Sequence, residues 1–279
     1  MQIDVKNVSF TYLKNTIQES KALDDVSYTI FDNDFLAIVG ETGSGKSTLV
    51  QMLNGLMTPD SGTIKVGDKV ITNNKKANKK LKELKREVGL VFQFPEHQLF
   101  EETVEKDVAF GLTNFGVAKE EALDQARKTL LSLGLDSSYF TKSPFDLSGG
   151  EKRRVAIAGI LTFNPKVIVL DEPTAGLDNK GQKTLIDLLN KLHKEGKTIV
   201  VISHDMSFVM KYCNRAIVLD KGNKVFEGTT KELMNSISDF PYLEMPKLYE
   251  VASKLGVDIK NINSLKDVID EYKKGRNNG

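Results

Sequence analysis

The sequence predicts an α/β fold built on a mostly parallel core sheet, and three observations support this prediction. Short apolar runs recur along the chain and are typical of strands that are buried on both faces. Segments with helical spacing of apolar residues separate these runs, which is the alternation expected of α/β proteins. Three stretches near the N-terminus instead alternate between apolar and polar residues or end in turn residues. We therefore expect an antiparallel β layer beside the core sheet.

The expected strands fall into two groups. Those of the antiparallel layer are Ile3 to Tyr12, Ala22 to Phe31 and Gly62 to Ile71. Those of the core sheet are Phe35 to Val39, Lys166 to Leu170, Thr198 to Ile202 and Arg215 to Leu219. Helices are expected after the glycine loop that follows the first core strand and again from Thr103 to about Leu135, where apolar residues recur on one helical face.

The composition indicates one large core with room for a small appended domain. The 279 residues are 40% hydrophobic, and the net charge is only +1, so bulk charge predicts neither nucleic-acid nor membrane binding. The single cysteine, Cys213, excludes a disulfide within the chain and suits a reducing cytosol. Neither a secretory leader nor an apolar run long enough to span a bilayer is visible, so we expect other chains to span any membrane.

A lysine-rich stretch runs from Asn73 to Arg86. It could face anionic lipid or nucleic acid, or it could be a solvated loop and helix. We favour the solvated loop and helix, because basic runs of this size are common on exposed helices.

A glycine-rich loop follows the first core strand. Gly40 to Thr48 reads GETGSGKST, which is the phosphate-binding loop pattern, and it lies between a buried strand and a helix as that pattern requires. Its glycines let backbone N–H groups turn toward phosphates, and the helix N-terminus adds partial positive charge. We expect Lys46 to bridge the β- and γ-phosphates of ATP and Ser47 to offer its hydroxyl to Mg²⁺. The other expected ATP-binding residues of the loop are Gly40, Gly43, Gly45 and Thr48.

Two carboxylates and a histidine follow later core strands. Asp171 and Glu172 come at the end of an apolar strand, at the sheet edge where open α/β sheets bind ligands. We expect Asp171 to hold Mg²⁺ and Glu172 to deprotonate the water that attacks the γ-phosphate. His204 has the corresponding place after the next strand, and we expect it to hydrogen-bond the γ-phosphate and to hold Glu172 in line. The sequence thus predicts an ATP hydrolase.

A second anion site is predicted at Leu147 to Glu151, which reads LSGGE. Ser148 and Gly150 lie at the start of a helical segment, where a hydroxyl and free backbone N–H groups are available. An ordinary capped helix would have the same sequence features, so this segment alone leaves both interpretations open. A second phosphate-binding element in one chain implies either two ligands or one ligand clamped between two copies.

Together with Tyr12, Gln93 and the AGLD segment that ends at Asp178, these motifs resemble the nucleotide-binding subunit of ATP-binding cassette (ABC) transporters over about residues 1–230. The resemblance implies a P-loop ABC ATPase fold and a head-to-tail pair of cassettes, with ATP held between the glycine loop of one and the Ser148 segment of the other. It implies that Tyr12 stacks on adenine and that Asp178 works across the dimer. It also implies that Gln93 contributes to catalysis and to Mg²⁺ binding and couples this region to the membrane partner. Glu151 departs from the glutamine of many family members, which leaves the nucleotide affinity of that side open.

Two further stretches narrow the resemblance. Phe92 to Val104 and Ala109 to Gly116 resemble the ATPases of energy-coupling factor (ECF) importers of vitamins and micronutrients, and the run FPEH resembles the second of their two paired ATPases. This implies a heterodimer with a second, unlike ATPase, a transmembrane scaffold subunit that docks near Gln93, and substrate-binding membrane subunits, with the chain at the cytoplasmic face of the membrane. Glu96 and Glu101 could pair with scaffold arginines, or they could simply be solvated.

The cassette pattern ends near Gly228. We expect an ABC nucleotide-binding domain at residues 1–228, with a helical subdomain at about 95–160, and a C-terminal helical extension at 229–279. Two apolar stripes indicate amphipathic helices in the extension, the second opening with a capping box from Ser264 to Asp267. The stripes are Leu248, Val251, Ala252 and Leu255, and Leu265, Val268, Ile269 and Tyr272. These helices could cover this cassette or the partner ATPase; the ECF resemblance implies the partner, and hence ATPase dimerisation. Lys273 to Gly279 is expected to be disordered.

Other classes of ATP-binding protein fit less well. A soluble ABC ATPase that acts on DNA or ribosomes would need a coiled-coil insertion or a second cassette in the chain, and we see neither, so no nucleic-acid partner is expected. A switch that never hydrolyses its nucleotide would not need Glu172 and His204. Within transport, the alternative is the ATPase subunit of a conventional ABC importer or exporter. The transported substrate does not follow from the sequence.

Overall fold

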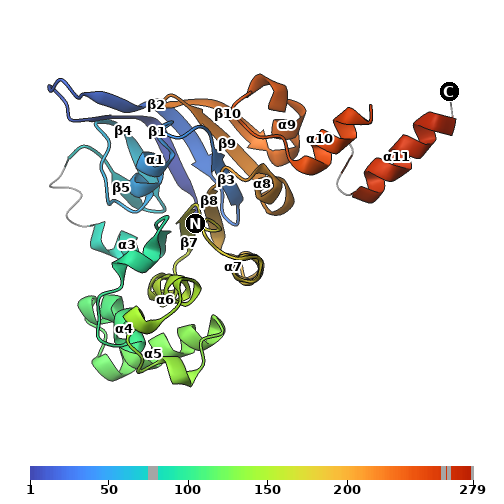
Figure 1. Cartoon of the computed structure of the whole chain (residues 1–279). Helices are drawn as coiled ribbons and strands as arrows, with labels where there is room; N and C mark the ends of the chain where they lie inside the picture. Colours follow the sequence, from blue (N-terminus) through green and yellow to red (C-terminus); the bar gives the residue numbers. More distant parts are fainter. Residues whose placement is uncertain (75–80, 259–261, 263–264, 278–279) are drawn as a thin grey trace.

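The computed structural model describes residues 1–74, 81–258, 262 and 265–277. Two sheets form the body of the molecule, a group of helices lies at one end of it, and the last two helices extend from another side, beyond α9 (Figure 1). Within the described residues, none of the helices combines the length and apolar character needed to cross a membrane.

The smaller sheet is antiparallel, as predicted. Its strand order is β2-β1-β4-β5. The strands are β1 (Ile3–Tyr12), β2 (Ser20–Ile30), β4 (Ser61–Val66) and β5 (Lys69–Ile71). The stretch predicted as one strand from Gly62 to Ile71 is two paired strands, because Gly67 takes a φ of 58° and the chain turns there.

The larger sheet confirms the prediction of a mostly parallel core. Its strand order is β10-β9-β3-β8-β7-β6, and every neighbouring pair is parallel except β10 with β9. The predicted strands are β3 (Phe35–Val39), β7 (Val167–Asp171), β8 (Thr198–Ile202) and β9 (Arg215–Asp220). Two strands were not predicted, β6 (Val88–Val91) and β10 (Asn223–Thr229).

Alternate residues of the core strands face two different layers. In β3, Leu36 and Ile38 pack with the antiparallel sheet and α1 (Lys46–Leu53), whereas Phe35, Ala37 and Val39 pack against the other layer. That second layer contains α7 (Asn179–Lys194), α8 (Met206–Tyr212) and α9 (Thr230–Asn235). Because both faces are covered, the core strands are continuous apolar runs, and the glycine loop at the end of β3 rests on a rigid support.

A group of helices forms its own apolar core beside the sheets (Figure 1). Its helices are α4 (Val104–Asn114), α5 (Lys119–Ser132) and α6 (Gly149–Leu161), preceded by α3 (Leu84–Glu87) and short 3₁₀ turns at Leu81–Glu83 and Pro95–Gln98. The predicted helical stretch from Thr103 to Leu135 is interrupted at Gly116, which takes a φ of 88°. Residues 75–80 of the lysine-rich stretch lie outside the described residues.

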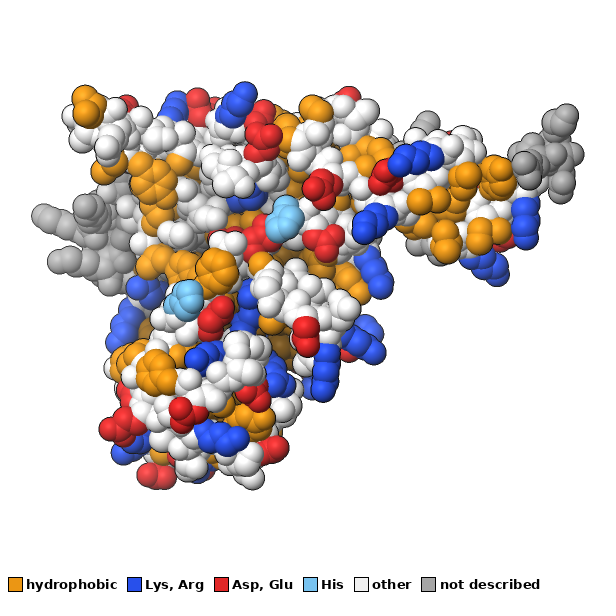
Figure 2. Space-filling view, viewed as in Figure 1, with side chains coloured by type: hydrophobic (Ala, Val, Ile, Leu, Met, Phe, Trp, Pro, Cys, Tyr) orange, Lys and Arg blue, Asp and Glu red, His pale blue; other side chains and the backbone are white. Residues whose placement is uncertain are grey.

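The C-terminal extension contains α10 (Lys247–Lys254) and α11 (Leu265–Asn277), where the two amphipathic helices were expected. Its apolar residues divide into two sets. Ala252 and Val268 are buried in the core of the same chain, whereas others remain exposed, and hydrophobic side chains are visible along the extension in Figure 2. The exposed set is Val251, Leu255, Leu265 and Ile269. The prediction of disorder from Lys273 is wrong as far as Asn277, because α11 continues to that residue. Ser264 and residues 278–279 lie outside the described residues.

Candidate nucleotide-binding site

Most of the predicted ATP-binding and catalytic residues line one cavity of ≈ 390 Å³ at the carboxyl end of the core sheet. They come from the antiparallel sheet, the glycine loop, the segment after β6 and the end of β7. The predicted residues that line it are Tyr12, Gly43, Gly45, Lys46, Ser47, Thr48, Gln93, Asp171 and Glu172. Residues that are far apart in the sequence therefore meet where open α/β sheets bind ligands.

Two glycines of the loop are required by the fold itself. Gly40 has a φ of 143°, and a Cβ there would lie 2.0 Å from the carbonyl oxygen of Leu219; Gly40 lies at the start of the loop, outside the lining of the cavity. Gly45 has a φ of 100°, and its Cβ would lie 2.3 Å from the carbonyl oxygen of Ala22. Gly43 also has a positive φ, of 83°, but a Cβ would meet nothing within 4 Å. Gly40 and Gly45 thus occupy positions where a side chain would collide with the backbone.

Lys46 closes back over the glycine loop. Its Nζ donates hydrogen bonds to the carbonyl oxygens of Gly40, at 2.8 Å, and Glu41, at 2.6 Å. Burial lowers the pKa of Lys46, and the carboxylates of Glu172 and Asp171 partly oppose this shift. A half-buried ammonium at the N-terminus of α1 is well suited to bind an anion such as a phosphate.

Ser47 and Asp171 form a pair of oxygen donors inside the cavity. The hydroxyl of Ser47 donates a hydrogen bond of 2.7 Å to Oδ2 of Asp171. Burial raises the pKa of Asp171, although this hydrogen bond and Lys46 oppose the shift. A hydroxyl, a carboxylate and the nearby amide of Gln93 are hard oxygen donors of the kind that Mg²⁺ prefers, so the residues fit this metal.

Glu172 is hydrogen-bonded to His204, so the two side chains lie together. Nδ1 of His204 is 2.9 Å from Oε1 of Glu172, and because a carboxylate only accepts, Nδ1 carries the proton. This hydrogen bond, and then the charge of Glu172, raises the pKa of His204. Glu172 has a φ of 48°, in the left-handed region that residues other than glycine rarely adopt. Its backbone N–H is held by the carbonyl oxygen of Ile202, at 3.0 Å.

Tyr12 lines the same cavity from the end of β1. Its hydroxyl is 2.9 Å from Oγ1 of Thr48, and its ring meets Phe10 edge to face with a centroid distance of 4.8 Å. The side chain is 40% exposed. These contacts fix the position of the ring and leave part of its surface open to a stacking partner.

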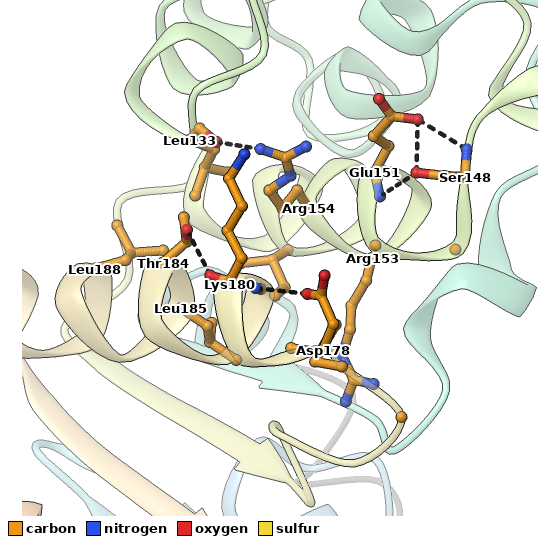
Figure 3. Close-up of a pocket in the computed structure, with 16 residues that line it drawn as sticks. Leu133, Ser148, Glu151, Arg153, Arg154, Asp178, Lys180, Thr184, Leu185 and Leu188 are labelled. Atoms are coloured by element: carbon orange, nitrogen blue, oxygen red, sulfur yellow. Dashed lines mark hydrogen bonds between the residues drawn. The ribbon is translucent and has the colours of Figure 1, made fainter.

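Three other predicted ATP-binding residues, Ser148, Gly150 and Asp178, line a separate cavity of ≈ 530 Å³ between α6 and α7 (Figure 3). Ser148 caps α6, and Asp178 caps α7 by accepting a hydrogen bond of 2.7 Å from the N–H of Gly181. A Cβ on Gly149 or Gly150 would meet nothing within 4 Å, so contacts within this chain do not require glycine there. The two cavities have no lining residue in common, and one chain does not bring Ser148 to Lys46.

Arg153 connects the two cavities, and the sequence analysis missed it. It lies on α6, lines the second cavity and is only 3% exposed. Its guanidinium donates to the carbonyl oxygens of Ala175 (2.6 Å), Glu172 (3.0 Å) and Gln93 (3.1 Å). A basic residue four positions before the buried Ile157 lies on the inward face of the helix, and that spacing could have identified it.

Comparison with known proteins identifies the family. Residues 23–175 match the family model described as ABC transporter. The chain belongs to the ABC transporter family. The cassette is 48% identical over 275 residues, 98% of both chains, to the energy-coupling factor transporter ATP-binding protein EcfA2 of Streptococcus pyogenes serotype M28 (strain MGAS6180). It is 49% identical over 267 residues to EcfA2 of serotype M5 (strain Manfredo), which covers 94% of the cassette and 95% of that relative.

Solved structures give the same result for the fold. The cassette is similar to MJ0796, an ATP-binding cassette whose dimer was solved in a post-hydrolysis state with ADP and Pi. The identity is 31% and the TM-score is 0.73, over 82% of this chain and 98% of that one. It is similar to cbiO1 from Clostridium perfringens, part of the ABC transporter complex cbiONQ, at 34% identity and a TM-score of 0.71 over 86% and 95%. The predicted P-loop ABC fold and the resemblance to the ECF ATPases are confirmed.

Proposed function

We propose that this chain is the ATP-hydrolysing subunit of an ECF-type importer and powers the uptake of vitamins or other micronutrients. The near-complete match to the EcfA2 proteins carries this proposal, together with the paired Glu172 and His204 beside the glycine loop. The chain works at the cytoplasmic face of the membrane, as a heterodimer with a second, unlike ATPase. A transmembrane scaffold subunit and substrate-binding membrane subunits complete the complex.

Glu172 acts as the general base in this proposal. Its carboxylate takes the proton of the water that attacks the γ-phosphate, and His204 orients the carboxylate through the 2.9 Å hydrogen bond to Oε1. The Glu172 side chain is 13% exposed while that of His204 is 75% exposed, so the base is shielded and its partner faces outward. Lys46 binds the β- and γ-phosphates, and Tyr12 stacks on adenine.

Mg²⁺ is the metal that the donor set fits. The hydroxyl of Ser47, the carboxylate of Asp171 and the amide oxygen of Gln93 would hold it. When bound, the metal neutralises phosphate charge during the reaction. The 2.7 Å hydrogen bond between Ser47 and Asp171 supports this assignment, because it shows that two of the donors already point toward one another.

A complete ATP site needs two cassettes in this proposal. ATP bound to the glycine loop of one cassette is contacted by Ser148 and Gly150 of the other, and Asp178 works across the same interface. The glycines at 149 and 150 support this arrangement, because their Cβ positions are open and a close approach from outside the chain explains their small size. The N-terminus of α6 is a favourable place for phosphate.

The surface around Gln93 is the proposed docking site for the membrane scaffold. Phe94 and Phe100 are exposed there, at 49% and 54%. Glu96 lies in the same segment, and its carboxylate would pair with an arginine from the scaffold. The carbonyl of Gln93 is bonded to Arg153, which connects this surface to the helix that carries Ser148.

The C-terminal extension at 229–279 is the proposed contact with the partner ATPase. Ala252 and Val268 already anchor α10 and α11 on their own cassette. The exposed apolar side chains of these two helices support the proposed role, because exposed apolar patches of this kind are typical of protein–protein contacts. We retain residues 1–228 as the proposed nucleotide-binding domain, with the helical subdomain at about 95–160.

Replacing Glu172 by glutamine tests the proposal. In the assembled complex, Glu172→Gln should lower Mg²⁺-dependent ATP hydrolysis by at least about 10²-fold while ATP binding is retained. Glu195→Gln, at an exposed position after α7, is the matched control and should leave turnover unchanged. Near-normal turnover in Glu172→Gln would refute the assigned base.

Co-purification distinguishes an ECF-type importer from a conventional ABC importer or exporter. The ECF proposal expects one small integral scaffold, a second unlike ATPase and exchangeable substrate-binding membrane proteins. A single dedicated permease in place of these chains would support the conventional transporter.

A further inference from the structure

Glu151 and Ser148 are joined by a closed set of hydrogen bonds (Figure 3). The hydroxyl of Ser148 donates to Oε2 of Glu151 at 2.7 Å, and the backbone N–H of Ser148 donates to the same oxygen at 2.8 Å. The backbone N–H of Glu151 lies 3.4 Å from the Ser148 hydroxyl oxygen. On the other side, the hydroxyl of Tyr139 donates to Oε1 of Glu151 at 2.7 Å. Both carboxylate oxygens are therefore engaged.

This arrangement uses the one proton of the Ser148 hydroxyl. Hydrogen bonds from Ser148 and Tyr139 lower the pKa of Glu151 to about 2, so its carboxylate is ionised at neutral pH. A hydroxyl that donates to a carboxylate makes a charge-assisted hydrogen bond, which is roughly twice as strong as a neutral one. For Ser148 to donate to a phosphate oxygen instead, its proton must first leave Glu151.

We propose that Glu151 is a positioning residue that holds the Ser148 hydroxyl away from the γ-phosphate and so weakens this chain's hold on the ATP bound to the partner cassette. The inference rests on the proposed composite site. The negative charge of Glu151 acts in the same direction, because a carboxylate beside the N-terminus of α6 opposes the attraction of the helix end for phosphate. Tyr139 reinforces the effect by fixing the second oxygen.

A second capping box in the same chain supplies the control. At the start of α9, Thr229 and Glu232 repeat the pattern, with the Thr229 hydroxyl and N–H donating to Oε2 of Glu232 at 2.8 and 2.7 Å. Neither residue lines the two cavities described above, and neither lies on α10 or α11, whose exposed apolar side chains form the proposed contact with the partner ATPase. A change at Glu232 thus reports what the loss of a charged helix cap does by itself.

The test is the ATP dependence of hydrolysis in the assembled transporter. Glu151→Gln keeps a capping-box residue but removes the charge. We expect the KM for ATP to fall about fivefold, with kcat changed less than about twofold, because a neutral acceptor releases the hydroxyl more easily. Glu232→Gln should leave both constants unchanged. An unchanged or higher KM in Glu151→Gln would overturn the inference.

A double variant shows whether Glu151 acts through Ser148. Adding Glu151→Gln to Ser148→Ala should lower the KM by much less than fivefold, because only the effect of the charge on the helix end remains when the hydroxyl is absent. A full fivefold fall in this background would overturn the assignment. A wild-type complex without Mg²⁺-dependent hydrolysis would overturn the proposed function and this inference with it, whereas an active complex whose KM ignores Glu151→Gln overturns only the role of Glu151.

Discussion

Replacing Arg153 by methionine should destabilise the cassette by about 3 kcal/mol. The guanidinium donates to three backbone carbonyls, those of Gln93, Glu172 and Ala175, and the residue is 3% exposed. A buried acceptor that loses its donor costs about 1–3 kcal/mol, so three such losses cost about 3–9 kcal/mol before any offset, and the expected value is the low end of that range. Part of this cost is offset because methionine removes a buried charge whose desolvation lowers the pKa of Arg153.

Urea unfolding of the full chain, followed by far-ultraviolet circular dichroism, measures this change. Arg154→Met is the matched control, since Arg154 makes a 3.5 Å hydrogen bond to the carbonyl of Leu133, and it should cost less than about 1 kcal/mol. The loss of stability in Arg153→Lys should fall between the losses in these two variants, because an ammonium lacks the planar fork that reaches several carbonyls. Equal losses in the two methionine variants would refute the reasoning.

Three further predictions follow from the site and the extension. Lys46→Ala should weaken ATP binding at least about tenfold by calorimetry, and unchanged affinity would count against its phosphate role. The pKa of His204, measured by NMR, should lie above 6.5 and move back toward that value in Glu172→Gln. Since the fold favours protonated His204, the pair stabilises the fold at low pH and this contribution disappears as pH rises through the raised pKa. Val251→Asp should release the partner ATPase on co-purification, whereas Leu131→Asp, on the exposed face of α5, should not; retention by both would argue against the extension as the contact.

The parts of the fold that the sequence predicted are those in which one local pattern settles the structure. Strand β3 is buried along its whole length, so it is a continuous apolar run followed by a glycine loop. Strand β6 was missed because it has only four residues and follows a basic stretch, and β10 because it is a half-exposed edge strand with no apolar run. The break at Gly116 was missed because apolar spacing continues on both sides of it.

The same distinction applies to the site. Lys46, Ser47 and Glu172 belong to contiguous motifs that directly follow buried strands, so their convergence follows from the parallel sheet. Arg153 is different, because its three acceptors come from loops that only the folded chain brings together. The bond between Tyr139 and Glu151 was equally invisible, since nothing in the local pattern at Tyr139 indicates a partner twelve residues away.

The left-handed backbone at Glu172 makes stability and catalysis compete at a single residue. An L-residue with a side chain pays about 1–2 kcal/mol to hold such a conformation, and glycine does not. Above the raised pKa of His204, where the pair no longer stabilises the fold, Glu172→Gly should therefore yield a chain that resists heat better but hydrolyses ATP at least about 10²-fold more slowly. Variants selected for thermal resistance alone would drift toward this loss, and only selection for transport keeps the carboxylate in place.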